Sequence, residues 1–298
     1  MAGDRIDITA ETVRALVATQ FPQWADLPIE RVALNGWDNS TFHLGARMKV
    51  RLPTAARYAL AVEKENTWLP RLAPQLPLPI PVPVAIGVPG QGYAWPWAVY
   101  DWLDGETVSS ERVRDPKQFA EALAGFLQTL WTIDTSGGPP AGEQNFHRGG
   151  SLKIYDAEAR ASMAALAQHI DGPGALAVWD AALAGSWSKP PVWVHGDIAV
   201  GNLLVRDGAL SAVIDFGGLG VGDPACDLVI GWVFMDEAAR AAFRARIGLD
   251  AATWARARGW ALWKAMLVME RGIVLNGAER PAAEAIRTVI AEHRREGL

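Results

Sequence analysis

Apolar residues recur at two spacings along the chain, and the spacing changes about a third of the way in. Thr9 is suited to cap a first helix, in which apolar residues follow at helical spacing until Phe21-Pro22 ends it. A second helix is predicted from about residue 55 to 72. Short apolar runs with turn signals around them predict strands in this part of the chain. These strands are expected within residues 31–45 (around the turn-rich NGWDNS), 46–53, VAIGVP and WPWAVYDWL.

From Asp115 onward the pattern becomes mainly helical. An amphipathic helix is predicted over residues 115–131, two more between 155 and 186, and further helices from Asp223 almost to the end. One exception is a hairpin, NLLVRDG followed by LSAVIDFG, whose Asp207-Gly208 pair is a strong turn signal. The chain is therefore predicted to have an α+β fold, strand-rich in its N-terminal third and helix-rich after the segment DWLDGET.

Composition narrows the classes of partner. The 298 residues are 50% hydrophobic and carry a formal net charge of −5, which argues against nucleic acid or an anionic membrane surface as partner. The single cysteine, Cys226, cannot form an internal disulfide and fits a reducing cytoplasm. Neither a signal peptide nor an apolar run of membrane-spanning length is recognised. A cytoplasmic protein with a small-molecule substrate is expected, and its oligomeric state is left open.

The stretch VWVHGDIAVGN ends an apolar run at His195-Gly196-Asp197, and Asn202 follows five residues after the acid. An Asp that a glycine places at a strand end can accept a proton from a substrate hydroxyl. Thirteen residues beyond Asn202, the run AVIDFGG brings Asp215 to another strand end. One amide oxygen and one carboxylate suit Mg²⁺ held together with phosphate oxygens. The set indicates phosphoryl transfer.

HGDIAVGN, VIDFGGLGVGDPACDL and their order resemble the aminoglycoside phosphotransferase family of small-molecule kinases. HGDxxxxN is specific when an apolar strand ending in DFG and then GDPxxDL follow it, as they do here. The resemblance implies a bilobal protein-kinase-like fold, with a nucleotide-binding lobe at residues 1–103 and a catalytic, substrate-binding lobe at 104–298. It implies Asp197 as catalytic base, Asn202 and Asp215 as Mg²⁺ ligands, and ATP or GTP as co-substrate.

Three residues near this set have supporting roles by the same resemblance. His195 belongs to the catalytic group, and an anchor for the loop is favoured over a carrier of protons. Asp223 precedes a proline, which is typical of a helix start, and Asp227 is expected to cap a helix or pair with the loop. Both acids would buttress the site.

In the first lobe, residues 35–45 resemble the phosphate-covering loop of the family, with Asn39 and Ser40 as candidate nucleotide contacts; a plain polar turn is the alternative. Where the family has a lysine, this chain has Arg51, and Glu65 is its expected partner. Arginine can bind phosphate bidentately. The pair Lys49 and Glu63 keeps the same spacing and is a second possibility, and a purely structural ion pair is a third.

The strand WAVYDWLDGE resembles the hinge between the two lobes. Its backbone around Tyr100, Trp102 and Leu103 is predicted to bind the adenine edge. Because the backbone carries this recognition, the side chains do not test it.

Residues 250–298 hold six acids and eight bases, so a carboxylate trough for a polycationic aminoglycoside is not evident. An apolar stripe of Trp254, Trp260, Trp263, Met266 and Leu267 is assigned mainly to the core, with the remainder available to an acceptor such as a macrolide or a sugar-like metabolite.

Three functions compete: an active Mg²⁺-dependent kinase, a nucleotide-binding regulatory module with little activity, and a metal-dependent hydrolase. The hydrolase would need more histidines than five scattered ones. Arg51 is the sole support for the regulatory module, and the kinase is favoured because Asp197, Asn202 and Asp215 are all present.

Overall fold

The computed structural model describes residues 5–33, 38–273 and 278–297. The chain divides into two compact units. Unit 1 comprises Met1–Gln75, Pro79–Asp104 and Asp215–Gly217, and unit 2 comprises Leu76–Leu78, Gly105–Ile214 and Gly218–Leu298. The short segment Asp215–Gly217 thus belongs to unit 1, although it lies far along the chain from the rest of that unit.

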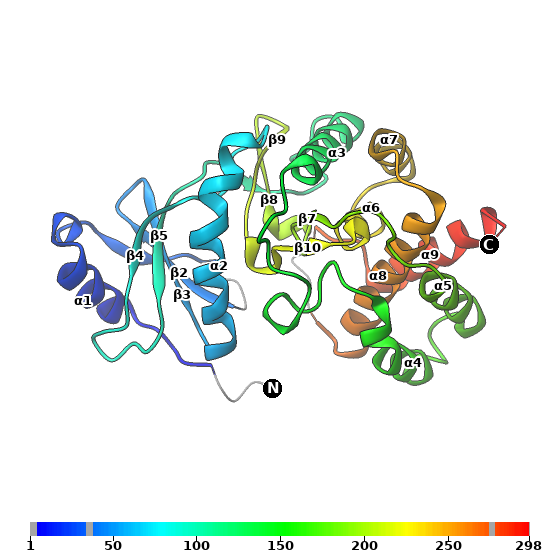
Figure 1. Ribbon diagram of the computed structural model, residues 1–298, viewed down its shortest axis with the longest axis horizontal. Coiled ribbons are helices and arrows are strands. Elements are labelled where there is room, and N and C mark those ends of the chain that lie inside the picture. The colour runs from blue at the N-terminus through cyan, green and yellow to red at the C-terminus, as the bar shows by residue number, and fades with distance from the viewer. Residues whose placement is uncertain (1–4, 34–37, 274–277, 298) are drawn as a thin grey trace. The chain divides into compact units, whose positions relative to one another are not determined.

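Unit 1 is built around an antiparallel sheet of five strands in the order β1-β2-β3-β5-β4 (Figure 1). In the central strand β3, Arg51 lies opposite Thr41 of β2 and Ala98 of β5. The strands are β1 (Ile29–Arg31), β2 (Asn39–Leu44), β3 (Met48–Pro53), β4 (Pro83–Gly87) and β5 (Trp97–Asp101). The helices are α1 (Ala10–Gln20) and α2 (Ala56–Leu72), each followed by a 3₁₀ turn, Pro22–Trp24 and Ala73–Gln75.

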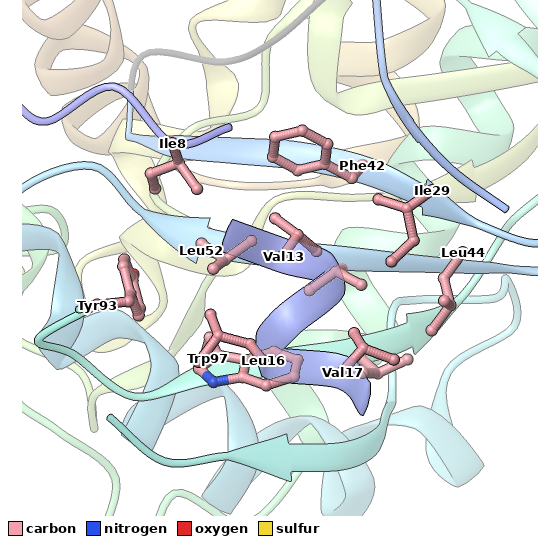
Figure 2. Packing of buried hydrophobic residues seen from close by; sticks show 12 residues of the cluster. Ile8, Val13, Leu16, Val17, Ile29, Phe42, Leu44, Leu52, Tyr93 and Trp97 are labelled. Atoms are coloured by element: carbon pink, nitrogen blue, oxygen red, sulfur yellow. The ribbon is translucent and has the colours of Figure 1, made fainter. Parts of the chain in front are cut away.

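The two faces of this sheet have different partners. Helix α1 packs its apolar side chains Val13, Leu16 and Val17 on one face, as Figure 2 shows. Val50 and Leu52 of β3 belong to that core, so the alternation of a strand turns Arg51 toward the opposite face. There Arg51 meets α2. A central strand with an apolar side and a charged side thus holds a guanidinium on a rigid element.

Unit 2 is mainly helical (Figure 1). The long helix α8 packs against α4, α5 and α9, while α3 packs against α7. The helices are α3 (Pro116–Thr132), α4 (Asp156–Ala165), α5 (Gly172–Ala184), α6 (Ile230–Val233), α7 (Glu237–Ile247), α8 (Ala251–Glu270) and α9 (Ala282–Arg295). Five 3₁₀ turns accompany them: Glu143–Asn145, Leu152–Tyr155, Val200–Asn202, Phe216–Gly218 (which extends into unit 1) and Pro224–Leu228.

Two small sheets in unit 2 lie next to the loops that carry the candidate acids. One pairs β7 with β10, and the other has the order β6-β8-β9. Their strands are β6 (Glu106–Thr107), β7 (Val192–Val194), β8 (Leu203–Arg206), β9 (Ala209–Val213) and β10 (Gly220–Gly222). Strand β7 leads directly into His195, and the hairpin β8–β9 turns at Asp207-Gly208, as predicted.

The long elements agree with the sequence predictions within a few residues, whereas the short strands β1, β6 and β10 were not predicted. Segment DGET was expected to be a turn, but its last two residues form β6 and pair with β8. Two or three residues carry too little pattern to identify a strand, because the partner strand decides their conformation.

The predicted phosphate-covering loop is described only in part, and its contact with a nucleotide stays a prediction. Residues 35–37 lie outside the described part of the chain, whereas Asn39 and Ser40 begin strand β2 and are paired with β3. The polar residues favoured a turn, but pairing with the central strand prevails.

Candidate active site

A sharp turn after strand β7 carries the His-Gly-Asp sequence. Gly196 has φ +85°, and a Cβ at this position would collide with the carbonyl oxygen of Gly218. Only glycine adopts this conformation without strain and leaves room for that carbonyl. The turn therefore requires glycine for two independent reasons, and it delivers Asp197 beyond the end of the strand.

Asp227 holds this turn in place through two hydrogen bonds. Its Oδ2 accepts a hydrogen bond of 2.8 Å from the His195 amide, and its Oδ1 accepts one of 2.7 Å from the Gly196 amide. The carboxyl is fully buried, and burial raises its pKa, although His195 and the two amides act in the opposite direction. The expected pairing of Asp227 with the loop is what the structure contains.

His195 is also buried, and both ring nitrogens face backbone groups. Nδ1 accepts from the Asp197 amide at 3.2 Å, which leaves Nε2 to donate to the Ile214 carbonyl at 3.1 Å. These two contacts tie the ring to the backbone of Asp197 and of Ile214. The role of His195 as a loop anchor stays a prediction.

Asp197, in contrast, has a half-exposed side chain, with 49% of its area accessible. Its Oδ2 accepts a hydrogen bond of 3.0 Å from Asn202 Nδ2, which also donates to the Asp197 carbonyl at 2.9 Å. Lys264 Nζ of α8 lies 3.6 Å from the other carboxylate oxygen. An oriented, accessible carboxylate next to a cation is suited to accept a proton from a bound hydroxyl.

The orientation of Asn202 leaves its amide oxygen for another partner. Because Nδ2 is used twice on Asp197, Oδ1 points elsewhere, and it accepts no hydrogen bond from the residues that the structure describes. A neutral oxygen of this kind is a typical ligand of a hard divalent cation.

In unit 1, Arg51 lies between two carboxylates. Nη1 is 3.4 Å from Glu65 Oε2 of α2, and Nη2 is 2.9 Å from Asp215 Oδ1. The Tyr100 hydroxyl donates to Glu65 at 2.7 Å. Burial disfavours the charge of Arg51, but the two carboxylates outweigh it and raise its pKa. Asp215 has φ +65°, an uncommon conformation outside glycine, which aims its side chain.

The alternative pair is not formed, since Lys49 makes no ion pair with Glu63 among the described residues. Instead its ammonium lies 5.8 Å from the centre of the Trp102 ring, and burial lowers its pKa to about 8. Lys64, a neighbour of Glu65 on α2, was not predicted. It donates to the Gly217 carbonyl at 2.7 Å, and burial lowers its pKa to about 8 as well.

The hinge residues differ in what they offer a nucleotide. Tyr100 lies within β5 and its hydroxyl is committed to Glu65. The Trp102 amide donates to the Arg47 carbonyl at 2.8 Å. Leu103 follows the end of β5 and makes no hydrogen bond within the described chain. On β2, buried Ser40 accepts from Arg31 at 3.4 Å.

Unit 2 holds a small, open pocket that includes Asp197. Lys264, Trp260 and Trp263 of α8 line it together with Arg148. Trp263 stacks on Tyr155 with ring centres 4.3 Å apart, and Trp260 meets the same tyrosine edge-on. The stripe predicted on this helix thus divides: Trp254 and Met266 are core residues, whereas Trp260 and Trp263 reach the pocket.

Sequence reasoning missed Arg148, Lys264 and Arg256. Arg256 of α8 binds the buried Asp223 through two hydrogen bonds of 2.6 and 3.2 Å, while Asp223 also caps the following 3₁₀ turn as predicted. A basic residue within an otherwise apolar helix is a signal for Lys264 and Arg256, but it does not name the partner. Arg148 stands before two glycines in a segment without periodicity.

The donor set fits Mg²⁺ better than a transition metal. In the described parts of the chain no three His, Cys, Asp or Glu side chains gather as a metal cluster. Mg²⁺ is commonly held by one or two protein oxygens together with substrate phosphates, so Asn202 and Asp215 are a chemically suitable pair.

None of the described helices has the length and apolarity to cross a membrane.

Comparison with known proteins identifies one family model and several solved structures that resemble this chain. The model of the phosphotransferase enzyme family matches residues 29–260. The solved GDP complex of wild-type aminoglycoside 2'-phosphotransferase-IIIa is 18% identical, covers 98% of this chain and 100% of that one, and has a TM-score of 0.67. The apoenzyme of macrolide 2'-phosphotransferase MphH from Brachybacterium faecium is 22% identical, covers 91% and 97%, and has a TM-score of 0.60. No curated protein sequence matches the chain.

At such low identities the structural likeness establishes the fold alone. Together with the strand-rich unit 1 and the helical unit 2, it confirms the predicted α+β, protein-kinase-like fold class.

Proposed function

Because this chain belongs to the phosphotransferase enzyme family, we propose that it moves the terminal phosphoryl group of ATP or GTP to a hydroxyl of a small molecule. The new bond joins the acceptor oxygen to phosphorus, the bond from phosphorus to the β–γ bridging oxygen breaks, and a nucleoside diphosphate leaves. The hydroxyl proton goes to Asp197.

The observation that supports this proposal is the position and accessibility of the Asp197 carboxylate. Its carboxylate is accessible, oriented by Asn202 and placed in a pocket, while the turn behind it is fixed by buried groups. A general base needs this combination of access and rigidity, because most of the catalytic effect in phosphoryl transfer comes from positioning.

The remaining assignments follow the chemistry of each side chain. Arg51, held by Glu65, is suited to bind phosphate oxygens, and Asn202 Oδ1 and Asp215 are assigned as the ligands of Mg²⁺, which would neutralise phosphate charge when bound. The free amide of Leu103 is the best candidate for the adenine edge. We retain residues 1–103 as the nucleotide-binding lobe and 104–298 as the catalytic lobe.

The acceptor is proposed not to be a polycationic aminoglycoside. The pocket around Asp197 is lined by two cations, Arg148 and Lys264, and by indole rings. A polycation would meet like charge there. Productive turnover of kanamycin would contradict this part of the proposal.

A second candidate function is a nucleotide-binding regulatory module with little transfer activity. The engagement of Asp215 by Arg51 favours it, because the pair withholds a metal ligand unless the nucleotide displaces or shares it.

Thermal unfolding with and without Mg²⁺ and ATP or GTP tests nucleotide binding. A ligand at a hundredfold excess over Kd adds roughly 2.7 kcal/mol to the free energy of unfolding. A Mg²⁺-dependent stabilisation that Asp215→Asn weakens is expected. A folded protein that no nucleotide stabilises would contradict both candidates.

Formation of phosphorylated product from a pool of hydroxylated metabolites then separates the two candidates. Asp197→Asn should lower transfer by about a hundredfold or more without affecting the nucleotide-induced stabilisation. Asp207→Asn is the matched control, because this exposed turn residue has φ +54°, which asparagine tolerates. Transfer that survives Asp197→Asn nearly intact would refute the role of Asp197, and an absence of transfer in the wild type would support the regulatory module.

A further inference from the structure

Arg148 is a cation in the pocket of Asp197 that has no anionic partner. Its guanidinium carbon lies 5.0 Å from the ring centre of Trp260 and 4.9 Å from that of Trp263. In the described chain its side chain makes no hydrogen bond and no ion pair. The residue is only partly exposed, so water solvates it incompletely.

The other buried arginines of unit 2 show how this chain treats such a group when its role is structural. Arg256 is paired with Asp223, and Arg240 and Arg258 are paired with Glu292. A partly desolvated guanidinium normally finds a carboxylate, because an unpaired charge is costly to bury. Arg148 has two indole rings instead.

Contact with two aromatic rings holds the guanidinium but gives its N–H groups no oxygen acceptor. An indole ring attracts the cation through its π electrons, whereas the five N–H donors need oxygen acceptors for strong hydrogen bonds. The edge of the guanidinium is the part that binds a carboxylate or a phosphate bidentately. Arg148 is therefore held in place with its hydrogen-bonding capacity unused.

The other lining groups do not supply the missing anion. Asp197 is 3.6 Å from Lys264, and the charge of Lys264 also acts on Glu279, so this cation already has two carboxylates nearby. Cys226 also lines the pocket, but burial raises the pKa of its thiol well above the ordinary value and keeps it neutral. The excess positive charge is thus localised at Arg148.

We propose that the acceptor is a hydroxylated organic anion whose carboxylate or phosphate group binds Arg148 while its hydroxyl meets Asp197. This inference rests on the proposed function and adds the chemical class of the acceptor.

Matched pairs of compounds that differ in one charged group test the proposal. Glycerate against glycerol and glucuronate against glucose examine a carboxylate, glucose 6-phosphate against glucose examines a phosphate, and glucosamine supplies a cation. Binding is measured first, as thermal stabilisation without nucleotide, on the wild type, Arg148→Met, Arg148→Lys and the control Arg295→Met, whose arginine is exposed and distant in sequence.

At least one anion is expected to stabilise the wild type more than its neutral counterpart. Loss of a charge-assisted bidentate contact should weaken that binding about tenfold or more in Arg148→Met. Arg148→Lys should show an intermediate loss and Arg295→Met none. The carboxylate and phosphate pairs identify which anion is preferred.

Transfer from radiolabelled ATP or GTP completes the test. The KM for the anionic acceptor should rise in Arg148→Met, while the KM for the nucleotide stays the same. Equal loss for both substrates would overturn the proposal, because it would place Arg148 on the transferred phosphoryl group. Equal binding of acids and alcohols, or no binding of any anion, would overturn it as well. Because the first measurement omits nucleotide, its outcome does not depend on whether the protein is a kinase.

Discussion

Arg51 Nη2 lies 2.9 Å from Asp215 Oδ1 and joins strand β3 to a residue 164 positions further along the chain. The carboxylate proposed to bind Mg²⁺ is therefore paired with an arginine. The same guanidinium contacts Glu65, so one cation serves two acids. Arg51 is therefore the residue through which the proposed nucleotide site can be tested.

Replacing Arg51 by methionine should weaken Mg²⁺-nucleotide binding and destabilise the protein. Glu65 is buried, and removal of one member of a buried ion pair costs about 3–5 kcal/mol. Because the Tyr100 hydroxyl still donates to Glu65, the expected loss of stability lies at the lower end of this range. Urea unfolding measures the stability, and titration calorimetry with ATP and Mg²⁺ measures the affinity.

Arg51→Lys is the companion variant. A lysine keeps the charge but has no bidentate fork, so it should retain nucleotide binding and lose only part of the stability. Nucleotide affinity in Arg51→Met equal to that of the wild type would show that the cluster is purely structural.

We expect Asp227 to fix the conformation of the turn at His195-Gly196 and to take no direct part in the reaction. Asp227→Ala leaves the amides of His195 and Gly196 unpaired in a buried place, at a cost of about 1–3 kcal/mol for each group. Asp227→Asn keeps one acceptor oxygen and should lose less. Chemical denaturation ranks the two variants.

The functional consequence of Asp227→Ala should be a lower kcat with a nearly unchanged KM for nucleotide, because Asp197 becomes misplaced while Arg51 does not. A variant as stable and as active as the wild type would mean that the turn holds its shape without the carboxylate.

The predictability of each part of the site depends on how far its contacts reach along the chain. The Arg51–Glu65 pair spans 14 residues, from a strand to the next helix, and the resemblance to the family suggested it. The Arg51–Asp215 and Lys264–Asp197 pairs join distant segments, and no local pattern encodes such a distance. Arg148 follows Phe146 and His147, both with φ +53°, in an irregular segment that offers no periodicity to read.

The predictability of the helices and strands also depends on their length and on the distance to their partners. Helices α2 and α3 repeat their apolar pattern often enough that their ends were predicted within a residue or two, whereas the later helices were predicted without individual ends. Strand β10 consists of three residues, two of them glycine, and exists because β7 pairs with it.

Lys49 should lower the stability of the protein near neutral pH. Burial and the neighbouring charge of Arg51 lower the pKa of Lys49 to about 8, against 10.5 for an ordinary lysine. Between these values the unfolded chain binds more protons than the folded one, so the contribution of Lys49 to the free energy of unfolding rises with pH. The destabilisation of the folded protein by Lys49 is therefore complete below about pH 8 and disappears above about pH 10.5.

Lys49→Met is therefore expected to raise the free energy of unfolding by on the order of 1–3 kcal/mol at neutral pH, with less gain toward pH 10. Urea unfolding at several pH values measures this. Lys64→Met is the comparison, because Lys64 has a similarly lowered pKa but also donates to Gly217, and its gain should be smaller. A destabilised Lys49→Met at neutral pH would show that the contact with Trp102 outweighs desolvation.

The buried cluster around Glu292 should dominate the stability of the helical unit. Glu292 accepts hydrogen bonds from Arg240 Nε at 3.0 Å, from Trp232 Nε1 at 3.1 Å and from Arg258 Nη1 at 3.4 Å. Glu292→Ala leaves two arginines and an indole without this acceptor, and the Arg258 side chain is fully buried. A loss of about 3–5 kcal/mol is expected.

Glu237→Ala is the matched control, because Glu237 also pairs with an arginine, Arg295, but both side chains are exposed to solvent. Exposed pairs contribute little, so this variant should unfold like the wild type. Glu292→Gln separates charge from hydrogen bonding. The amide oxygen still accepts from one donor, while Arg240 loses its carboxylate partner and Arg258 keeps only Glu296. If Glu292→Gln is as stable as the wild type, hydrogen bonding rather than charge holds the cluster; if Glu292→Ala is as stable too, the arginines are solvated by water and the cluster contributes nothing.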